Sequence, residues 1–356
     1  MGNVLLTGPA VRALAAAGRG VSFLAGPDGA EAAGLLPGVT EVLTWRVPWI
    51  DATPVPVGHA ALGKVTRILR RRRFSEAVIF TSFHQSPLPT ALVLRVAGVA
   101  RISAISSDYP GSLLDVRHQV DEDLPEADRN MSLVHAAGFE LPSGDDGLLA
   151  IRGPLPDARR LAGREPYVVV HPTASVPARA PSPGRCAAIV KALSKAGHRV
   201  VVTGTNADRA VTAQVSDDVA VDLGGRTTRP MLAAVLAGAD VVVAPNTGAA
   251  HLAAAVGTPV VSLFAPVVPL ARWRPHRVPT IVLGDQDAAC AGSRARICPV
   301  AGHPCLNLID AAEVVTAVAT LSRRQRPIPS PPAHTVRGRQ RPIPSPPAHT
   351  AVGVTA

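Results

Sequence analysis

Short apolar runs alternate along the chain with longer segments in which apolar residues recur at helical spacing. In the first half, the pattern predicts strands at residues 21–26, 41–45, 77–83 and 100–106, and helices near residues 5–17, 58–73 and 88–97. A strand that alternates with a helix is typical of right-handed βαβ units around a parallel sheet.

The second half repeats this alternation. The predicted strands are 167–171, 198–203, 219–223, 240–244, 259–264 and 280–283, and the predicted helices lie near 184–196, 207–215, 229–238, 249–256 and 309–324. In the last helix, Asp310 is the predicted N-cap and Glu313 its capping-box partner. A polar region near 140–166 separates the two sets of strands, so we predict two Rossmann-like domains.

The predicted domains cover residues 1–150 and 151–322, and a basic Pro-rich tail covers residues 323–356. The tail repeats the segment RQRPIPSPPAHT at 324–335 and 339–350. Proline cannot donate a backbone hydrogen bond, so we predict a disordered tail. A docking role for an acidic surface or a Pro-binding module is the alternative.

The charge of the chain gives little support to a role in nucleic-acid binding. The formal net charge is +10, but six arginines and no acids lie from Arg323 onward. The remaining 30 basic residues exceed the 26 acidic residues by only four. Basic residues are not interleaved with base-stacking aromatic residues, so nucleic-acid binding is a minor alternative.

The chain offers neither an apolar run of the roughly 18 residues that membrane spans need nor a visible signal peptide, so we predict a cytoplasmic protein. Four cysteines in 356 residues do not make a disulfide framework. Cys290, Cys298 and Cys305 lie near His303 at a spacing unlike that of common zinc sites, and we predict reduced thiols rather than a metal.

The stretch VVVAPNTGAAHLAAAVGTPVVSLFAP at 241–266 is the most informative part of the chain. A strand ends at Pro245, and Asn246 or Thr247 is placed to cap the following helix. Gly248 allows another group to approach the backbone, and a free helix N-terminus favours phosphate. His251, one turn later, either donates to a phosphate or ribose or packs between the domains.

Two further loops follow strands of the same predicted sheet. HPTASVPAR at 171–179 offers the hydroxyl groups of Thr173 and Ser175 and the guanidinium of Arg179, which is either a phosphate ligand or a solvated side chain. Asp208 either contacts a ribose or caps a helix. A G-x-G-x-x-G motif is absent from the sequence, so a dinucleotide cofactor is unsupported and no cofactor is predicted.

Four motifs together resemble glycosyltransferase family 9, the ADP-heptose:lipopolysaccharide heptosyltransferases. They are GNVLLTGPAVRALAA at 2–16, HPTASVPAR at 171–179, NTGAAHLAAAVGTPVVSLFAP at 246–266 and RWRP at 272–275. The resemblance implies an α/β protein of GT-B fold, with two Rossmann-like domains facing each other across a cleft. It implies an inverting transfer of a heptose-like sugar from a nucleotide diphosphate donor, ADP-linked in the family, to a glycan or glycolipid, without a metal.

Carried over by position, Thr247, Gly248 and His251 hold the donor diphosphate, Thr173 binds phosphate, and Arg179 offsets the charge of the leaving group. Ser175, Asp208 and Asn246 complete the predicted donor site. The family's general base is an aspartate where this chain has Asn3, and an amide cannot take up a proton. A second family aspartate corresponds to Asn246.

Replacement bases and acceptor-side residues are sought in two loops after predicted strands, and the candidates are His84, Gln85, Asp108 and Asp115. The family's opening strand does not precede Met1, so we also expect an incomplete first sheet. We therefore carry two hypotheses: a glycosyltransferase, or an impaired relative that binds nucleotide-sugar without efficient transfer. A peripheral contact with the inner face of the membrane is a further alternative.

Overall fold

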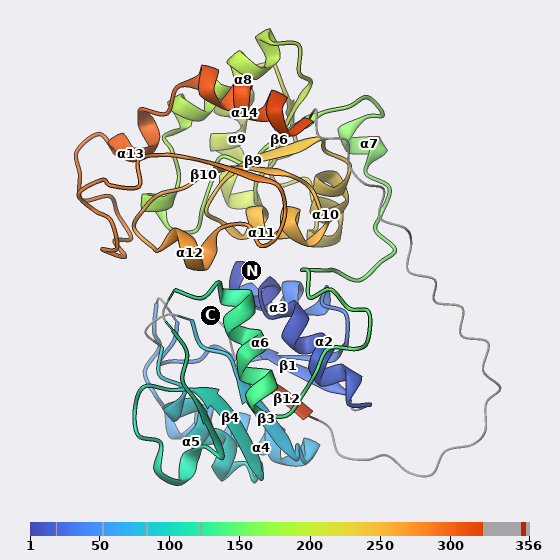
Figure 1. Ribbon diagram of the computed structural model, residues 1–356, viewed down its shortest axis with the longest axis vertical. Helices are drawn as coiled ribbons and strands as arrows, with labels where there is room; N and C mark the ends of the chain where they lie inside the picture. Colours follow the sequence, from blue (N-terminus) through green and yellow to red (C-terminus); the bar gives the residue numbers. More distant parts are fainter. Residues whose placement is uncertain (19, 52, 83–84, 122, 323–349, 354–356) are drawn as a thin grey trace, which may run out of the picture.

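The computed structural model describes residues 1–18, 20–51, 53–82, 85–121, 123–322 and 350–353. Two six-stranded sheets, each flanked by helices, form two stacked halves of the molecule (Figure 1). Every strand pair in both sheets is parallel. The predicted α/β class with parallel sheets is therefore confirmed.

The first sheet has the strand order β2-β1-β12-β3-β4-β5. Its strands are β1 (Val21–Ala25), β2 (Val39–Thr44), β3 (Glu76–Ile79), β4 (Arg101–Ile105), β5 (Val116–His118) and β12 (Thr350–Gly353). Its helices are α1 (Gly2–Leu5), α2 (Gly8–Ala16), α3 (Pro27–Gly34), α4 (His59–Arg72), α5 (Leu88–Val96) and α6 (Glu126–Ala136), with the 3₁₀ turn η1 (Gly111–Leu113).

The second sheet has the order β11-β10-β9-β6-β7-β8. Its strands are β6 (Val168–Val170), β7 (Val200–Val202), β8 (Val221–Asp222), β9 (Val241–Pro245), β10 (Val260–Leu263) and β11 (Thr280–Leu283). Its helices and 3₁₀ turns are α7 (Arg159–Ala162), η2 (Pro177–Arg179), α8 (Pro183–Lys195), η3 (Asn206–Asp208), α9 (Arg209–Ser216), α10 (Arg229–Ala237), α11 (Gly248–Ala255), α12 (Leu270–Trp273), α13 (Pro304–Asn307) and α14 (Ala311–Ser322).

The central strands are buried along their whole length. Every residue of β6, β7, β9 and β10 is buried, because helices cover both faces of the sheet. These strands are mostly valine, whose branched side chain suits a pleated surface. The predicted N-cap of the last helix is also present, since Asp310 Oδ1 accepts from the Ala312 backbone N–H at 3.0 Å.

The C-terminal segment departs from the predicted disordered tail. Residues 323–349 and 354–356 of that tail lie outside the described residues, but Thr350–Gly353 form β12 between β1 and β3. The position is the centre of the first sheet, where the sequence predicted a missing strand. Without β12, strands β1 and β3 would each expose an edge with unpaired backbone N–H and C=O groups. The four residues of β12 form hydrogen bonds with both edges.

The two halves meet through helices. Helix α1 packs along α11 (Figure 1), and a small apolar cluster of Leu6, Ala127, Leu149, Ala254 and Ala255 joins them. Among the described residues, we find no helix with both the length and the apolar character to cross a membrane.

Candidate active site

The loop after β9 presents the start of α11. Thr247 is the N-cap of that helix, and its side chain makes no capping hydrogen bond. At the other end, Gly257 has φ +77°, its N–H donates to Ala254 at 3.1 Å and the Thr258 N–H donates to Ala253 at 2.9 Å. These two hydrogen bonds form a Schellman motif, which ends α11 at Gly257.

Two polar side chains at this helix start are buried without partners. Asn246 is 6% exposed, and within the part of the chain that the structure describes neither its Oδ1 nor its Nδ2 has a hydrogen-bond partner. His251 is 4% exposed, and its Nδ1 likewise finds no partner among these residues. Buried polar groups are normally satisfied, so these atoms indicate a place for a ligand.

Burial also sets the charge of the imidazole. Desolvation, with smaller contributions from nearby positive charges, lowers the pKa of His251 to about 4. At neutral pH the ring is uncharged and therefore has one N–H donor and one acceptor nitrogen. A neutral donor can bind a phosphate oxygen without a proton being taken up.

Arg179 ends the 3₁₀ turn η2 after β6. Its Nε is buried and has no partner among the described residues, and burial followed by the charge of Arg296 lowers its pKa. Arg179 is one of the charges that act on His251, so the two side chains lie within electrostatic reach of each other. Arg179 thus lies within electrostatic reach of His251, and binding of one ligand by Arg179, Asn246 and His251 stays a prediction.

Other residues of the predicted donor site lie in the neighbouring loops. Thr173 is half-buried and Ser175 is exposed in the loop after β6. Asp208 closes a capping box: its Oδ2 accepts from the Thr205 N–H at 2.8 Å and from the Thr205 hydroxyl at 2.5 Å. Of the two roles considered for Asp208, the cap is therefore observed, and the ribose contact stays a prediction.

The start of the chain packs against the same helix. A Cβ atom added at Gly2 would lie 2.7 Å from His251 Cδ2, so no larger residue fits there without movement. Asn3 follows on α1, which places it at the boundary between the two halves, beside α11. Arg229, at the start of α10, reaches across to Glu31 with a 3.1 Å ion pair.

The acceptor-side candidates from the sequence have local partners. His84 lies outside the described residues. Gln85 Oε1 accepts from the Ser82 N–H at 2.9 Å, and Asp108 Oδ2 accepts from the Ser86 hydroxyl at 3.3 Å.

Asp115 is a structural residue. It pairs with Arg95 at 2.5 Å and accepts from the Ile102 N–H at 2.6 Å. Burial alone would raise its pKa, but these hydrogen bonds lower it. The half-buried Arg95 and the Ile102 N–H therefore hold this carboxylate between α5 and β4, a structural role that needs no catalysis.

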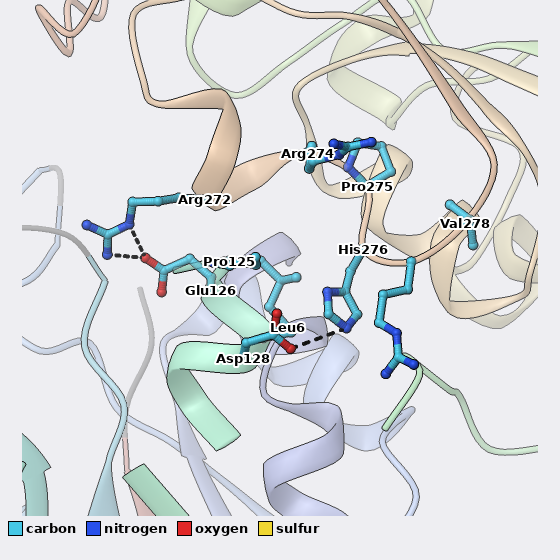
Figure 2. Close-up of a pocket in the computed structure, with 11 residues that line it drawn as sticks. Leu6, Pro125, Glu126, Asp128, Arg272, Arg274, Pro275, His276 and Val278 are labelled. Atoms are coloured by element: carbon cyan, nitrogen blue, oxygen red, sulfur yellow. Dashed lines mark hydrogen bonds and ion pairs between the residues drawn. The ribbon is translucent and has the colours of Figure 1, made fainter. Parts of the chain in front are cut away.

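The family resemblance implied a cleft between the two halves, but it did not name the residues that line this one. Leu6 and the first turn of α6 line this cleft on one side and residues 274–278 line it on the other (Figure 2). Its volume is about 270 Å³. Asp128 faces His276 across it, with 4.0 Å between Oδ1 and Nε2. Of the motifs found in the sequence, RWRP is the one that reaches this cleft. Nothing in the sequence indicated that residues of α6 would lie opposite it.

A buried ion pair flanks the cleft. Arg272 Nε donates to Glu126 Oε1 at 2.9 Å, Arg272 Nη2 donates to the same oxygen, and both side chains are at least 94% buried (Figure 2). Glu126 also lies 3.7 Å from Arg129 of its own helix. This pair ties α6 to α12, and so the first half to the second.

The sequence profile of glycosyltransferase family 9 (heptosyltransferase) matches residues 64–302, more than half of the chain. The chain belongs to glycosyltransferase family 9. The matched span contains Arg179, Asn246 and His251, whereas Asn3 lies before it.

Individual relatives share only a low sequence identity with this chain. The chain is 29% identical over 164 residues to lipopolysaccharide heptosyltransferase 3 of Escherichia coli, a match over 44% of this chain and 46% of that protein. The match thus spans less than half the length of this curated relative.

Solved structures agree in fold. The E. coli ADP-heptose lipopolysaccharide heptosyltransferase II has a TM-score of 0.68 at 18% identity, with 89% of this chain and 94% of that chain covered. A family 9 glycosyltransferase of Veillonella parvula has a TM-score of 0.70 at 17% identity, with 90% and 94% covered. The predicted GT-B fold of the family is thereby confirmed.

The family 9 chain shows no grouping of three or more histidine, cysteine or acidic side chains suited to a metal ion within its described residues. Cys290 and Cys305 are buried and form no disulfide, and burial, followed by the neighbouring thiols, raises the pKa of Cys305 to about 11. A thiol with so high a pKa stays protonated at neutral pH, which makes it a poor nucleophile.

Proposed function

We propose that this family 9 chain is an inverting glycosyltransferase that moves a heptose-like sugar from an ADP-linked donor to a glycan or glycolipid. The donor diphosphate occupies the start of α11, between Asn246, His251 and Arg179. The E. coli relatives carry ADP-heptose and lipopolysaccharide in their names, and one heptosyltransferase in the fold comparison was solved with ADP-2-deoxy-2-fluoro heptose. Those names support the choice of donor and acceptor class.

One observation carries the proposal. Asn246 and His251 are buried at the start of α11 with unpartnered polar atoms, and the half-buried Arg179, whose buried Nε also lacks a partner among the described residues, acts electrostatically on His251. Leaving such atoms unpaired costs about 1–3 kcal/mol each. A ligand with several acceptor oxygens, such as a diphosphate, would satisfy Arg179 Nε, Asn246 Nδ2 and an N–H of His251 together.

The chemistry follows from that placement. The acceptor hydroxyl oxygen forms a bond to the anomeric carbon, and the bond from that carbon to the diphosphate oxygen breaks. Negative charge grows on the leaving diphosphate, where Arg179 and the free N–H groups of α11 stabilise it. The hydroxyl proton must pass to a base, and Asn3, at the family's base position, cannot accept it.

The second candidate function follows from Asn3 and from Asn246. An impaired relative would keep the donor site and lose transfer, because removal of a general base typically costs about 10²- to 10⁴-fold in rate. Acceptor-dependent release of nucleotide separates the two functions.

The location and partners belong to the same proposal. We place the enzyme in the cytoplasm, at the inner face of the membrane, and expect a nucleotide-sugar donor and no nucleic acid. The last turn of α4 carries Arg70, Arg71 and Arg72, of which Arg72 is paired with Glu41. Arg70 donates through Nη2 to the Val96 carbonyl at 2.8 Å, and the exposed Arg71 is the residue we propose for contact with an anionic headgroup.

The donor site is tested by thermal unfolding with ADP, GDP, UDP and dTDP. We expect ADP to raise the melting temperature by several degrees, because a ligand at a hundred times its Kd adds about 2.7 kcal/mol. Arg179→Gln should abolish the shift, and Arg160→Gln, which alters an exposed arginine of α7, should keep it. A cooperative melt that none of the four nucleotides shifts would refute the donor site.

A further inference from the structure

A long loop of the second half has two attachments at the carboxyl edge of its sheet. The loop covers residues 284–303, between β11 and α13. Its first attachment lies beside β10, where the Gly292 N–H donates to the Pro266 carbonyl at 2.8 Å. Two residues later, the Arg294 N–H donates to the Val267 carbonyl at 2.8 Å. The loop is thereby fixed to the segment that leaves β10.

The second attachment of the loop lies on the far side of the donor loop. The Ala178 N–H, in the turn η2 after β6, donates to the Arg296 carbonyl at 3.0 Å. Strand β9 lies between β10 and β6 in the sheet. Residues 292–296 therefore cross from the β10 side to the β6 side, over the end of β9 that leads into α11. We call residues 290–298 the strap.

Two buried cysteines anchor this loop. Cys290 and Cys305 belong to the apolar cluster of the second half, and Cys298 of the strap packs against the same cluster. The Asp285 N–H also donates to the Cys305 carbonyl at 3.1 Å, which closes the base of the loop. The thiols are therefore packing groups that hold the strap in place.

The strap carries an arginine close to Arg179. Arg296 is exposed, and its side chain has no hydrogen-bond or ion-pair partner among the residues that the structure describes. Its positive charge follows burial as the second cause that lowers the pKa of Arg179. Arg179 likewise forms no ion pair in the described part of the chain. Two like charges repel each other at short range, and an anion between them would offset this repulsion.

The groups around the start of α11 offer two separate places for phosphate. One is the helix N-terminus itself, with the buried Asn246 and His251 beside it. The other lies between Arg179 in η2 and Arg296 in the strap, since a guanidinium binds phosphate oxygens through paired N–H donors. A nucleoside diphosphate supplies one phosphate for each place, whereas a monophosphate leaves one place empty.

We propose that the strap covers the donor diphosphate, and that Arg296 determines the specificity for a nucleoside diphosphate over a nucleoside monophosphate. The inner phosphate lies at the start of α11, and the terminal phosphate lies between Arg179 and Arg296. The inference rests on the proposed donor site. It adds a residue that lies outside all four motifs by which the sequence resembles family 9.

Calorimetric titration of ADP and of AMP into the full chain tests this assignment. We expect Arg296→Gln to weaken ADP binding by about 10- to 100-fold, the usual effect of losing a hydrogen bond to a charged group. AMP affinity should stay unchanged, because AMP lacks the terminal phosphate. Arg296→Lys keeps the positive charge and should lose less ADP affinity than Arg296→Gln.

Two controls separate this effect from a change in the fold. Arg160→Gln removes an exposed arginine of α7 and should bind both nucleotides like the unmodified chain. Without ligand, Arg296→Gln should melt at the temperature of the unmodified chain, since the Arg296 side chain is exposed. ADP should also slow amide hydrogen exchange in residues 290–298 of the unmodified chain, and AMP should do so less.

The outcomes distinguish the inference from the proposed function. Selective loss of ADP affinity in Arg296→Gln would support the assignment. Unchanged ADP affinity, or an equal loss for ADP and AMP, would overturn it even if transfer proceeds. An unmodified chain that binds ADP through Arg296 but transfers no sugar would overturn the transferase function and leave the inference standing. A chain that binds no nucleoside diphosphate would overturn the donor site and the role of the strap together.

Discussion

At the scale of single residues, the second half of the molecule is unusual for the polar side chains that it buries at the ends of its strands. His171, Asn246 and His251 are each at most 7% exposed, beside strands made almost wholly of valine. His171 is satisfied, since its Nδ1 lies 3.0 Å from the Thr203 hydroxyl oxygen, but the other two are not. An unsatisfied buried amide and imidazole would cost stability that a bound ligand can recover.

Replacement of Arg179 tests the charge at this site. We expect Arg179→Gln to lower the transfer rate by about 10²- to 10³-fold, the cost of removing one preorganised group that stabilises developing charge. The measurement is initial rate against donor concentration, with Arg160→Gln as the matched control. A rate within threefold of the unmodified chain would remove Arg179 from the mechanism.

The buried histidines predict a pH dependence of folding. Burial lowers the pKa of His171 and of His251 to about 4 in the folded chain, whereas an unfolded histidine titrates near 6.5. Between these values the unfolded chain binds more protons, so stability is full above about pH 6.5 and is lost as the pH falls toward 4. The loss is on the order of 3 kcal/mol for each histidine.

Urea unfolding between pH 7 and pH 4.5 measures this effect. His251→Gln should flatten the acid limb of the stability curve, and His59→Gln, which alters an exposed histidine, should leave it unchanged. Equal acid limbs in the His251→Gln variant and the unmodified chain would contradict the assignment of a buried neutral imidazole.

Single residues also show what the sequence could and could not provide. Asn246 and His251 were found because five positions separate them on one strand-to-helix turn. Asp128 and His276 are 148 positions apart, and they meet only because α6 and the segment after α12 face each other across the two halves. A local sequence pattern therefore cannot reveal that Asp128 and His276 face each other.

At the scale of elements, β12 has the clearest consequence. It pairs with β1 through Val21–Thr350 and Phe23–Val352, and with β3 through Val352–Val78. Because β12 has a neighbouring strand on each side, its own backbone N–H groups can all donate hydrogen bonds within the sheet. The first sheet therefore depends on a segment that follows α14 by 27 residues.

Disruption of β12 should destabilise the first sheet. Deletion of residues 350–356 should lower the melting temperature and make unfolding less cooperative, since β1 and β3 would both become edges. Val352→Pro should do the same by removing one ladder donor, while Val352→Thr, which keeps the N–H and the β-branch, should not. If deletion and Val352→Pro both melt like the full chain, the sheet does not need this strand.

Elements that the sequence missed have physical explanations. Strand β5 is only Val-Arg-His, too short and polar for its apolar pattern to be seen. Helix α6 buries Glu126, Arg129 and Asn130 together with apolar residues, so charged and amide residues share its inward face and blur the helical period. In both elements, polar residues held by tertiary contacts weaken the apolar signal on which the prediction relied.

At the scale of the whole molecule, the two halves are joined by small apolar residues and a few ionic contacts. The pair between Arg272 and Glu126 is the most buried of these contacts. Removing one partner of a buried pair leaves a desolvated charge, which typically costs about 3–5 kcal/mol.

Glu126→Gln should therefore destabilise the molecule by about 3 kcal/mol. The double variant Glu126→Gln/Arg272→Met should lose less than the sum of the two single variants, because neither charge is then left alone. Chemical denaturation of the three variants gives this cycle, and strict additivity would show that the pair does not couple the halves.

The overall architecture was largely predictable. The buried strands of the second sheet are short valine-rich runs and those of the first are short, mainly apolar runs, and helical patterns alternate with both, so the alternation indicated two sheets. The cleft between the halves was implied by the family resemblance, but its lining was not predictable, because its walls come from the ends of α1, α6 and α12, which meet only in the folded molecule. The donor loop is local in sequence, whereas a cleft lined by both halves is not.

The most direct test of the account is release of ADP from ADP-heptose by the full chain, with and without truncated-core lipopolysaccharide, with the product identified by mass spectrometry. The account predicts release that depends on the acceptor and equals the amount of acceptor that gains one heptose. A folded chain that binds ADP but releases none above background would contradict it, and would identify the protein as a donor-binding relative without transfer.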